Sequence, residues 1–512
     1  FFFGAAMPSI QSKLSNAQDC SHKIAWAGMA ISDEELSCIS GDEFKYNIMN
    51  QAKSKCESSC ESEAYGRDSD TSSDSGSVEV EELPFVINEI ITKYGLEYVK
   101  NSLLSEISDY VKAKITTEHL EEAFYVVDLG PVFRRWGTWM RLMPRVKPHY
   151  AVKCNPSPVI LALLAALGTG FDCASSRELD LVASLGVDVS KRVIFANPCK
   201  LPGHIRYARQ LGCNLSTFDT ESELHKIKEL FPESNLVLRI RADDPNARCQ
   251  LGNKFGAESE DVAGLLQLAK NLSLTVVGIS FHVGSGATDP LAFKEAIKSA
   301  RVAWDEGLKL GFEFNLLDIG GGFCGEQDMD GLALAPVADA VNAALNEHFP
   351  PTMDCHIIAE PGRYFAEACA TLVTNVYGRR QRKTVVDGES KVEMDYWISD
   401  GLYGSMNCLV YDHAVLSPKP LYMVPNANQN TYSSTLFGPT CDGLDCVVRD
   451  VDLPLMHNGD WVLFPCMGAY TMAAGSDFNG FNITQMKRYY VWSLDSGVDV
   501  DLGPGPDPGA GK

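Results

Sequence analysis

Polar residues that could do chemistry stand at the ends of several short apolar runs. A lysine amine set among apolar residues is desolvated, which lowers its pKa and makes it the nucleophile that reacts with carbonyl groups. Most lysines are instead solvated surface charges, and this remains the alternative for Lys153. The candidates are Lys153 (HYAVKC), Asp172 (GFDCA), Arg239 (NLVLRI), His282 and Ser285 (TVVGISFHVGSG) and Glu360 (HIIAE).

Glycines and an arginine follow the last two of these runs. Gly320, Gly321 and Gly322 come after FNLLDI, and Arg363 comes three residues after Glu360. Backbone N–H groups of a glycine loop and a guanidinium fork together form an anion site, although a glycine run by itself is a tight turn as often as a ligand loop. A phosphate site opposite a reactive lysine predicts a phosphorylated aldehyde cofactor, pyridoxal 5′-phosphate.

That cofactor needs an acid facing its ring nitrogen, because a protonated ring is the better electron sink. Glu360 is in the right place, although it could merely pair with Arg363 or cap a turn. His282 could stack on the ring, although a lone strand histidine is more often a core residue.

The apolar runs are the elements that must position these residues. Eight runs between about 146 and 360 alternate with segments of helical period, such as ILALLAALG and ELDLVASLG. Eight βα units over about 240 residues predict a TIM barrel, whose active groups gather at the carboxyl ends of its strands. Strand-like pieces beyond Ala366 predict an antiparallel β-domain, and we expect 378–395, which is rich in charge, to be an exposed loop.

These patterns divide the chain into five parts. Residues 1–82 form an acidic, Ser-rich extension in which we expect disorder, because 56–80 have almost no apolar residues; the part before them could instead be a short appendage. Residues 83–128 are expected to pack with the β-domain, 129–366 to form the cofactor-binding barrel, 367–500 to form the β-domain, and 501–512 to form a Gly/Pro-rich tail.

Charge and cysteine usage narrow the class of protein. Lys and Arg number 44 against 67 Asp and Glu, which gives a net charge of −23 and disfavours nucleic acid as a partner. The longest apolar stretch, 159–168, is too short to span a membrane. The 16 cysteines include no CxxC pair, so we expect no structural metal and free thiols in a reducing, cytoplasmic location.

Longer motifs carry a family resemblance. The strings AVKCN, GTGFDCAS, FANPCK, SFHVGSG, LLDIGGGF, AEPGRY, DGLYGSMNC, GPTCDGLD and MGAYT follow one another between Leu120 and Ser493. In this order they resemble eukaryotic ornithine decarboxylases, which are fold-type III pyridoxal-phosphate enzymes. The resemblance implies an α/β TIM (β/α)8 barrel of the alanine-racemase type plus a β-domain. It also implies conversion of L-ornithine to putrescine and CO2, the opening step of polyamine biosynthesis.

The resemblance also implies roles for single residues. Lys153 would be the Schiff-base lysine, His282 would stack on the ring, and Glu360 would pair with the ring nitrogen. Asp400 and Asp442 would hold the distal amine of the substrate, and Cys441 would protonate Cα. Cys441 and Asp442 would come from the second subunit of a homodimer with shared active sites, and antizyme is a further implied partner. The remaining cofactor contacts would be Asp172, Glu178, Arg239, Ser285, Gly320, Gly321, Gly322, Arg363 and Tyr470.

Three other functions compete. The same fold serves decarboxylases of lysine, arginine or diaminopimelate, and one methylene between ornithine and lysine is worth only about 1–3 kcal/mol of discrimination. Antizyme inhibitors resemble this family but lack activity, and a racemase is a weaker third. The N-terminal extension is unlike the usual family ends, so antizyme control stays open.

Overall fold

The computed structural model describes residues 83–242, 244–245, 247–287, 289–325, 332–386, 389–424 and 430–494. The predicted acidic extension 1–82 and the Gly/Pro-rich tail 501–512 lie outside the described residues.

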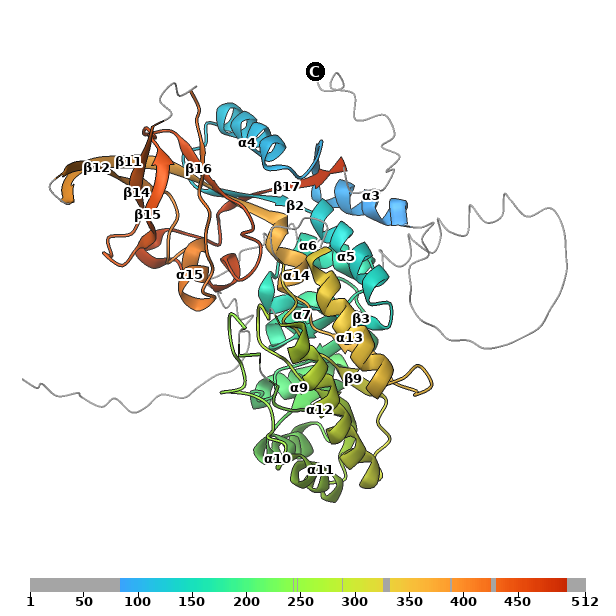
Figure 1. The fold of residues 1–512 in the computed structure, drawn as a ribbon. Helices are drawn as coiled ribbons and strands as arrows, with labels where there is room; N and C mark the ends of the chain where they lie inside the picture. The colour runs from blue at the N-terminus through green and yellow to red at the C-terminus, as the bar shows by residue number, and fades with distance from the viewer. Residues whose placement is uncertain are drawn as a thin grey trace, which may run out of the picture. The chain divides into compact units, whose positions relative to one another are not determined.

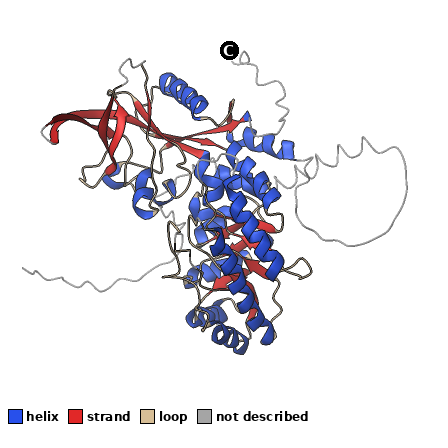
Figure 2. Cartoon of the chain, viewed as in Figure 1, coloured by secondary structure: helices blue, strands red, loops and turns tan. Residues whose placement is uncertain are grey.

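A closed barrel of eight strands lies at the centre of the α/β part, in the order β10-β3-β4-β5-β6-β7-β8-β9. All neighbouring strands are parallel, and helices surround them (Figures 1 and 2). The predicted TIM barrel is therefore confirmed, with each of the eight apolar runs forming a strand. The strands are β3 (Val146–Ala151), β4 (Gly170–Cys173), β5 (Val193–Phe195), β6 (Leu215–Phe218), β7 (Asn235–Arg239), β8 (Thr275–Ser280), β9 (Leu316–Asp318) and β10 (His356–Ala359).

The helices of the barrel follow the apolar periodicity of the sequence. In α7 the side chain of Ser175 accepts a hydrogen bond from the Glu178 N–H at 3.3 Å, which begins the helix. Gly212, with φ of 78°, ends α9 in the left-handed conformation that glycine adopts without strain. The helices are α5 (Gly130–Leu142), α6 (Pro158–Ala166), α7 (Ser176–Ser184), α8 (Val189–Arg192), α9 (Pro202–Leu211), α10 (Glu221–Leu230), α11 (Val262–Asn271), α12 (Pro290–Lys309), α13 (Ala335–His348) and α14 (Arg363–Ala366).

The β-domain contains a nine-stranded sheet that is mixed, not purely antiparallel as predicted. β17 runs parallel to β1 and β2, and β12 runs parallel to β14. Parallel neighbours need a long connection, and here the whole barrel lies between β2 and β17. The strands are β1 (Glu97–Val99), β2 (Phe124–Asp128), β11 (Ala370–Val386), β12 (Glu389–Ile398), β13 (Lys419–Leu421), β14 (Thr431–Phe437), β15 (Cys446–Pro454), β16 (Trp461–Phe464) and β17 (Lys487–Ser493), with a short helix α15 (Cys408–Tyr411).

The predicted loop 378–395 is instead a hairpin of β11 and β12. Its charged side chains pair across the strands: Arg380 contacts Asp395 at 2.6 Å, and Arg382 contacts Glu393 at 3.3 Å. The sequence interpretation failed because these strands are rich in charged residues and show no apolar alternation. Cross-strand charge pairs stabilise the hairpin instead.

The segment before the barrel contributes to both parts of the structure. α4 (Leu104–Glu118) places Ile107, Val111 and Ile115 in a core with Phe124 of β2 and Trp461 of β16. α3 (Leu83–Tyr94) contacts the barrel helix α6, and its buried isoleucines belong to the same hydrophobic cluster as Tyr125 and Val127 of β2.

Asp128 joins the barrel to the sheet. Its Oδ1 accepts hydrogen bonds from the N–H of Gly130 at 2.9 Å and of Ser493 at 3.0 Å, which ties α5 to β17. The side chain is buried, and burial raises its pKa to about 6 against the opposing effect of these hydrogen bonds.

The raised pKa predicts a pH-dependent stability. Between about pH 4 and pH 6 the folded state holds a proton on Asp128 that the unfolded chain has already lost, so stability falls as pH rises and stops falling above the folded pKa of about 6. We expect Asp128→Asn to remove about 1.4 kcal/mol of this decline. Urea unfolding of both proteins at pH 5 and pH 7 measures it. Equal pH dependence in the two proteins would contradict the assignment.

The described residues also limit other classes of site. Their twelve cysteines are all free thiols. None of the helices in this part of the chain is long and apolar enough to cross a membrane. Within the same residues, no group of three His, Cys, Asp or Glu side chains is arranged to hold a metal ion.

Candidate active site

Seven of the fifteen predicted site residues line one pocket at the carboxyl ends of the barrel strands. The short helical turn Val152–Cys154 after β3 brings Lys153 there, and residues after β8, β9 and β10 complete the wall. Because all eight strands are parallel, residues far apart in the chain converge at this end. The predicted residues that line the pocket are Lys153, His282, Ser285, Gly322, Glu360, Arg363 and Tyr470.

Lys153 faces the pocket and forms an ion pair with Asp172 of β4. Its side chain is 41% exposed, whereas that of Asp172 is 1% exposed. The prediction of a lowered pKa for Lys153 is wrong. Burial alone lowers the pKa of the Lys153 amine, but Asp172 and Glu360 raise it by more, so it lies above its usual value. The neighbouring carboxylates outweigh desolvation.

Glu360 belongs to a group of buried carboxyls. Burial raises its pKa well above the usual value, and Asp318 and Asp172 raise it further. Asp318 ends β9 and accepts a hydrogen bond from the Gly320 N–H at 2.9 Å, and burial raises its pKa to about 7. A cation placed against Glu360 would relieve this repulsion.

The three glycines approach the pocket wall more closely than any side chain would allow. A Cβ on Gly321 would lie 2.8 Å from both the Glu360 carbonyl oxygen and His282 Nε2. One on Gly322 would lie 2.6 Å from the Gly284 oxygen, and φ there is 109°. Only glycine keeps this loop against the pocket.

We expect Gly321→Ala to weaken cofactor binding at least about tenfold, because the new methyl must displace either Glu360 or His282. Dialysis followed by titration of the cofactor absorbance measures the affinity. Gly264→Ala on α11 is the matched control, since a Cβ there meets no atom within 4 Å and alanine favours a helix. Unchanged affinity in Gly321→Ala would contradict this role for the loop.

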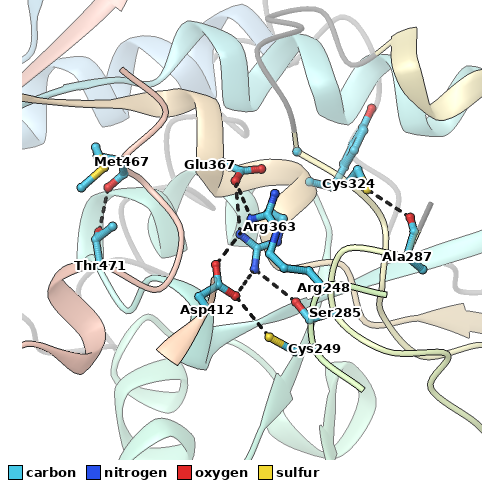
Figure 3. A network of polar contacts seen from close by, with 12 residues as sticks. Arg248, Cys249, Ser285, Ala287, Cys324, Arg363, Glu367, Asp412, Met467 and Thr471 are labelled. Carbon is cyan, nitrogen blue, oxygen red and sulfur yellow. Dashed lines mark hydrogen bonds and ion pairs between the residues drawn. The ribbon is translucent and has the colours of Figure 1, made fainter. Parts of the chain in front are cut away.

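Arg363 is the centre of a charged network at one end of the pocket (Figure 3). It donates to Asp412 Oδ1 at 2.6 Å, to Ser285 Oγ at 3.2 Å and to Glu367 Oε1 at 3.2 Å. Arg248 contacts the same two carboxylates, each at 3.5 Å. In this network, two guanidiniums therefore share two carboxylates.

His282 and Tyr470 are held by the backbone around them. His282 Nδ1 accepts a hydrogen bond from the Gly284 N–H at 3.0 Å, which leaves the proton on Nε2. Burial, Arg239 and Lys153 lower the pKa of His282 well below its usual value. Tyr470 has a φ of 54°, and its ring centroid lies 5.1 Å from the Arg363 guanidinium carbon.

Two predicted cofactor contacts lie behind the pocket wall. The Glu178 carboxylate accepts the Ala174 N–H at 2.6 Å at the start of α7, where it caps the helix. Arg239 ends β7 with its guanidinium carbon 5.3 Å from the Phe255 ring centroid. It acts on the pocket through charge, because it lowers the pKa values of Glu360 and Asp318.

The predicted substrate residues do not join the pocket of their own chain. Asp400 accepts hydrogen bonds from the N–H groups of Gly401 at 2.7 Å and Ser405 at 3.1 Å, so its carboxylate holds its own turn. The prediction that Asp400 binds substrate is therefore corrected. Cys441 is exposed, and Asp442 accepts a hydrogen bond from Tyr403 on the surface of the β-domain.

The sequence interpretation missed four polar residues around the site. Asp318 ends a barrel strand, so the rule that found Lys153 would also have found it. The other three had no such signal. Asp412 follows the short helix α15, Glu367 begins a short 3-10 helix, and Arg248 lies in a loop. Only the packing of the β-domain against the barrel brings Asp412 to Arg363.

The donor set fits pyridoxal 5′-phosphate. The Lys153 amine matches its aldehyde, and the buried Glu360 carboxyl with its raised pKa matches its ring nitrogen. The cationic end of the pocket, with Ser285 and Tyr470, matches its phosphate. Arg363 Nε is buried and has no hydrogen-bond partner among the described residues, so it has unused capacity for an anion. The glycine loop supplies N–H groups where a Cβ would block approach.

Comparisons with known proteins agree with this site. A profile described as "Pyridoxal-dependent decarboxylase, pyridoxal binding domain" matches residues 129–367. Rat (Rattus norvegicus) ornithine decarboxylase is 45% identical over 76% of this chain and 86% of its own length. Antizyme inhibitor 2 of Xenopus laevis is also 45% identical, over 74% of this chain and 83% of its own length.

The solved structures include the Paramecium bursaria Chlorella virus arginine decarboxylase bound to agmatine. It is 40% identical, covers 75% of this chain and 100% of its own, and has a TM-score of 0.69. Family profile, relatives and fold thus agree with the predicted resemblance. The chain belongs to the eukaryotic fold-type III pyridoxal-phosphate decarboxylases, and its cofactor is pyridoxal 5′-phosphate.

Proposed function

We propose that this decarboxylase converts L-ornithine to putrescine and CO2, the opening step of polyamine biosynthesis. The observation that carries the proposal is the buried carboxylate of Asp412 beside the Lys153 pocket. A substrate with a terminal ammonium suits this carboxylate, and a substrate with a terminal carboxylate does not. The 45% identity to rat ornithine decarboxylase supports the same substrate.

The charges near Arg363 explain how the Asp412 carboxylate becomes available to the distal ammonium of the substrate. The two positive charges of the guanidiniums balance the two negative charges of the carboxylates in this network. When a phosphate engages Arg363, Arg248 alone is left against Asp412 and Glu367. One negative charge then remains for the distal ammonium of the substrate.

The other predicted site residues bind the cofactor and move protons. The cofactor supplies an aldehyde for the substrate amine and a ring that accepts the electron pair left when CO2 departs. Lys153 holds the cofactor and moves protons at the substrate nitrogen, with Asp172 orienting its amine. Glu360 stabilises positive charge on the ring nitrogen, and Ser285, the glycine loop 320–322, Arg363 and Tyr470 hold the phosphate.

We also propose a homodimer with shared active sites. Cys441 and Asp442 lie outside the pocket of their own chain, so they would reach the site of the second subunit, where Cys441 protonates Cα. Mixing Lys153→Ala with Cys441→Ala protein tests this, because hybrid dimers would regain one intact site. Antizyme binding stays a prediction from the resemblance, and a cytoplasmic location stays a prediction from the cysteine usage.

The test of the substrate is CO2 release from carboxyl-labelled ornithine, lysine and arginine by the cofactor-loaded protein. We expect kcat/KM to be greatest for ornithine. A preference for lysine or arginine would overturn the substrate and keep the decarboxylase.

A regulator without activity is the second candidate, because Xenopus antizyme inhibitor 2 is as similar as rat ornithine decarboxylase. The pocket that contains Lys153, Glu360 and Arg363 argues against it. No CO2 from any of the three substrates, together with antizyme binding, would establish this candidate instead.

A further inference from the structure

A second cavity opens at the amino-terminal ends of the barrel strands, opposite the Lys153 pocket. Its volume is about 550 Å³, within the range of small-molecule sites. Residues near the starts of β3, β6, β7, β8, β9 and β10 line it: Lys147, Leu215, Asn235, Val277, Leu316 and His356. Active groups of such barrels gather at the other end, so this cavity is separate from the decarboxylase site.

The wall of this cavity is cationic. Arg145, Lys147 and Lys191 line it together with His149 and His356, and no aspartate or glutamate does so among the described residues. The whole chain has a net charge of −23, so the cluster runs against the overall charge. In the described part of the structure, neither lysine forms an ion pair. Asp188, which is exposed beside Lys191, has its pKa lowered by hydrogen bonds from Ser190, by the charge of Lys191 and by a hydrogen bond from the Lys191 N–H.

Among the described residues, the two guanidiniums nearby donate their hydrogen bonds to amide and carbonyl oxygens, although the charge of Asp188 acts on Arg192. Arg145 donates to Asn346 Oδ1 at 3.1 Å and to the Phe349 carbonyl oxygen at 2.5 Å. Arg192 donates to the carbonyl oxygens of Ala165 and Thr169. Burial and Arg192 together lower the pKa of Lys147. Mutual repulsion of this kind is relieved by a bound anion.

His149 adds a buried polar group to the wall. Its Nδ1 lies 3.5 Å from the Lys147 carbonyl oxygen, and its ring packs so closely on Gly170 that a Cβ there would lie 2.4 Å from Nε2. Burial lowers its pKa to about 4, and Lys147 and Arg192 lower it further against the effect of that hydrogen bond. The lysines and Arg145 therefore supply the charge of the wall, and His149 stays neutral beside them.

The floor of the cavity is apolar. Leu215, Val277, Leu316 and Ile358 line it, and they belong to a hydrophobic cluster inside the barrel with Ile194 and Val237. A ligand that fills the site therefore needs an anionic end for the cations and a flat apolar body for the floor. We propose that this cavity binds a nucleoside phosphate, with its phosphates on Arg145, Lys147 and Lys191 and its base on the apolar floor.

The test uses protein loaded with pyridoxal 5′-phosphate, so that the phosphate site at Arg363 is filled. Calorimetric titration with ADP, inorganic pyrophosphate and adenosine compares the two halves of the ligand. We expect ADP to bind at least about tenfold more tightly than either fragment. No binding of ADP, or binding no tighter than that of pyrophosphate, would overturn the proposal.

Two variants locate the site. We expect the Lys147→Gln, Lys191→Gln double variant to weaken ADP binding at least about tenfold, and the control Lys228→Gln, an exposed lysine on α10, to leave it unchanged. Val277→Trp narrows the floor without changing charge, so it should weaken ADP but not pyrophosphate. ADP affinity that survives in the double variant would place the nucleotide elsewhere. Thermal melting confirms that each variant is folded, and none of these readouts depends on decarboxylase activity.

Discussion

Replacing Lys153 with alanine is expected to lower the rate of CO2 release from ornithine at least about 1000-fold, because nucleophile and proton carrier are lost together. The change also leaves Asp172, which is 1% exposed, without its ion-pair partner. An unpaired buried carboxylate is unfavourable, so the variant should also be less stable. Labelled CO2 release and the cofactor absorbance are measured on the same preparation.

Two controls make the Lys153 result specific. Lys228→Ala removes an exposed lysine of α10 and should keep full activity. Lys153→Ala, Asp172→Asn removes both members of the ion pair and should recover stability without recovering activity. If Lys153→Ala retained a tenth of the parental rate, this lysine would not be the residue that holds the cofactor.

Asp412→Asn is expected to raise the KM for ornithine about 100-fold, which corresponds to about 2.7 kcal/mol. Asparagine keeps the shape and one acceptor for Arg363 but removes the negative charge that the substrate ammonium needs. The value of kcat should fall less than KM rises. Because Asp412 also contacts Arg363, cofactor affinity is measured in parallel. A loss of cofactor affinity with no change in KM would show that Asp412 only positions Arg363.

Asp400→Asn is the matched comparison, since the two aspartates are twelve residues apart and both are buried. Asp400 accepts hydrogen bonds from Gly401 and Ser405 of its own turn, and burial raises its pKa to about 6. We expect Asp400→Asn to change stability and to leave the KM for ornithine within about twofold. The opposite pattern in the two variants would restore the original prediction for Asp400.

Local sequence patterns were sufficient to predict the barrel and the residues at its strand ends. Each barrel strand is an apolar run, and a parallel strand that is buried on both faces has to be apolar. Parallel strands also bring their carboxyl ends to one side, so the prediction that Lys153, His282 and Glu360 meet followed from position in the chain alone. The glycine loop was also predicted from its position after a barrel strand, and the structure shows that a Cβ would clash there.

Tertiary packing decided the rest. Lys153 has a raised pKa because Asp172 and Glu360 lie close to it, and distances between strands cannot be read from one strand. Asp412, Glu367 and Arg248 come from three separate connections and meet only around Arg363. The amino acid sequence by itself determined which elements form, because a buried face of a strand or helix requires apolar residues at a regular spacing along the chain. Which charged side chains share a site was decided only by the folded structure, because Coulomb interactions depend on distances between segments that the chain order does not contain.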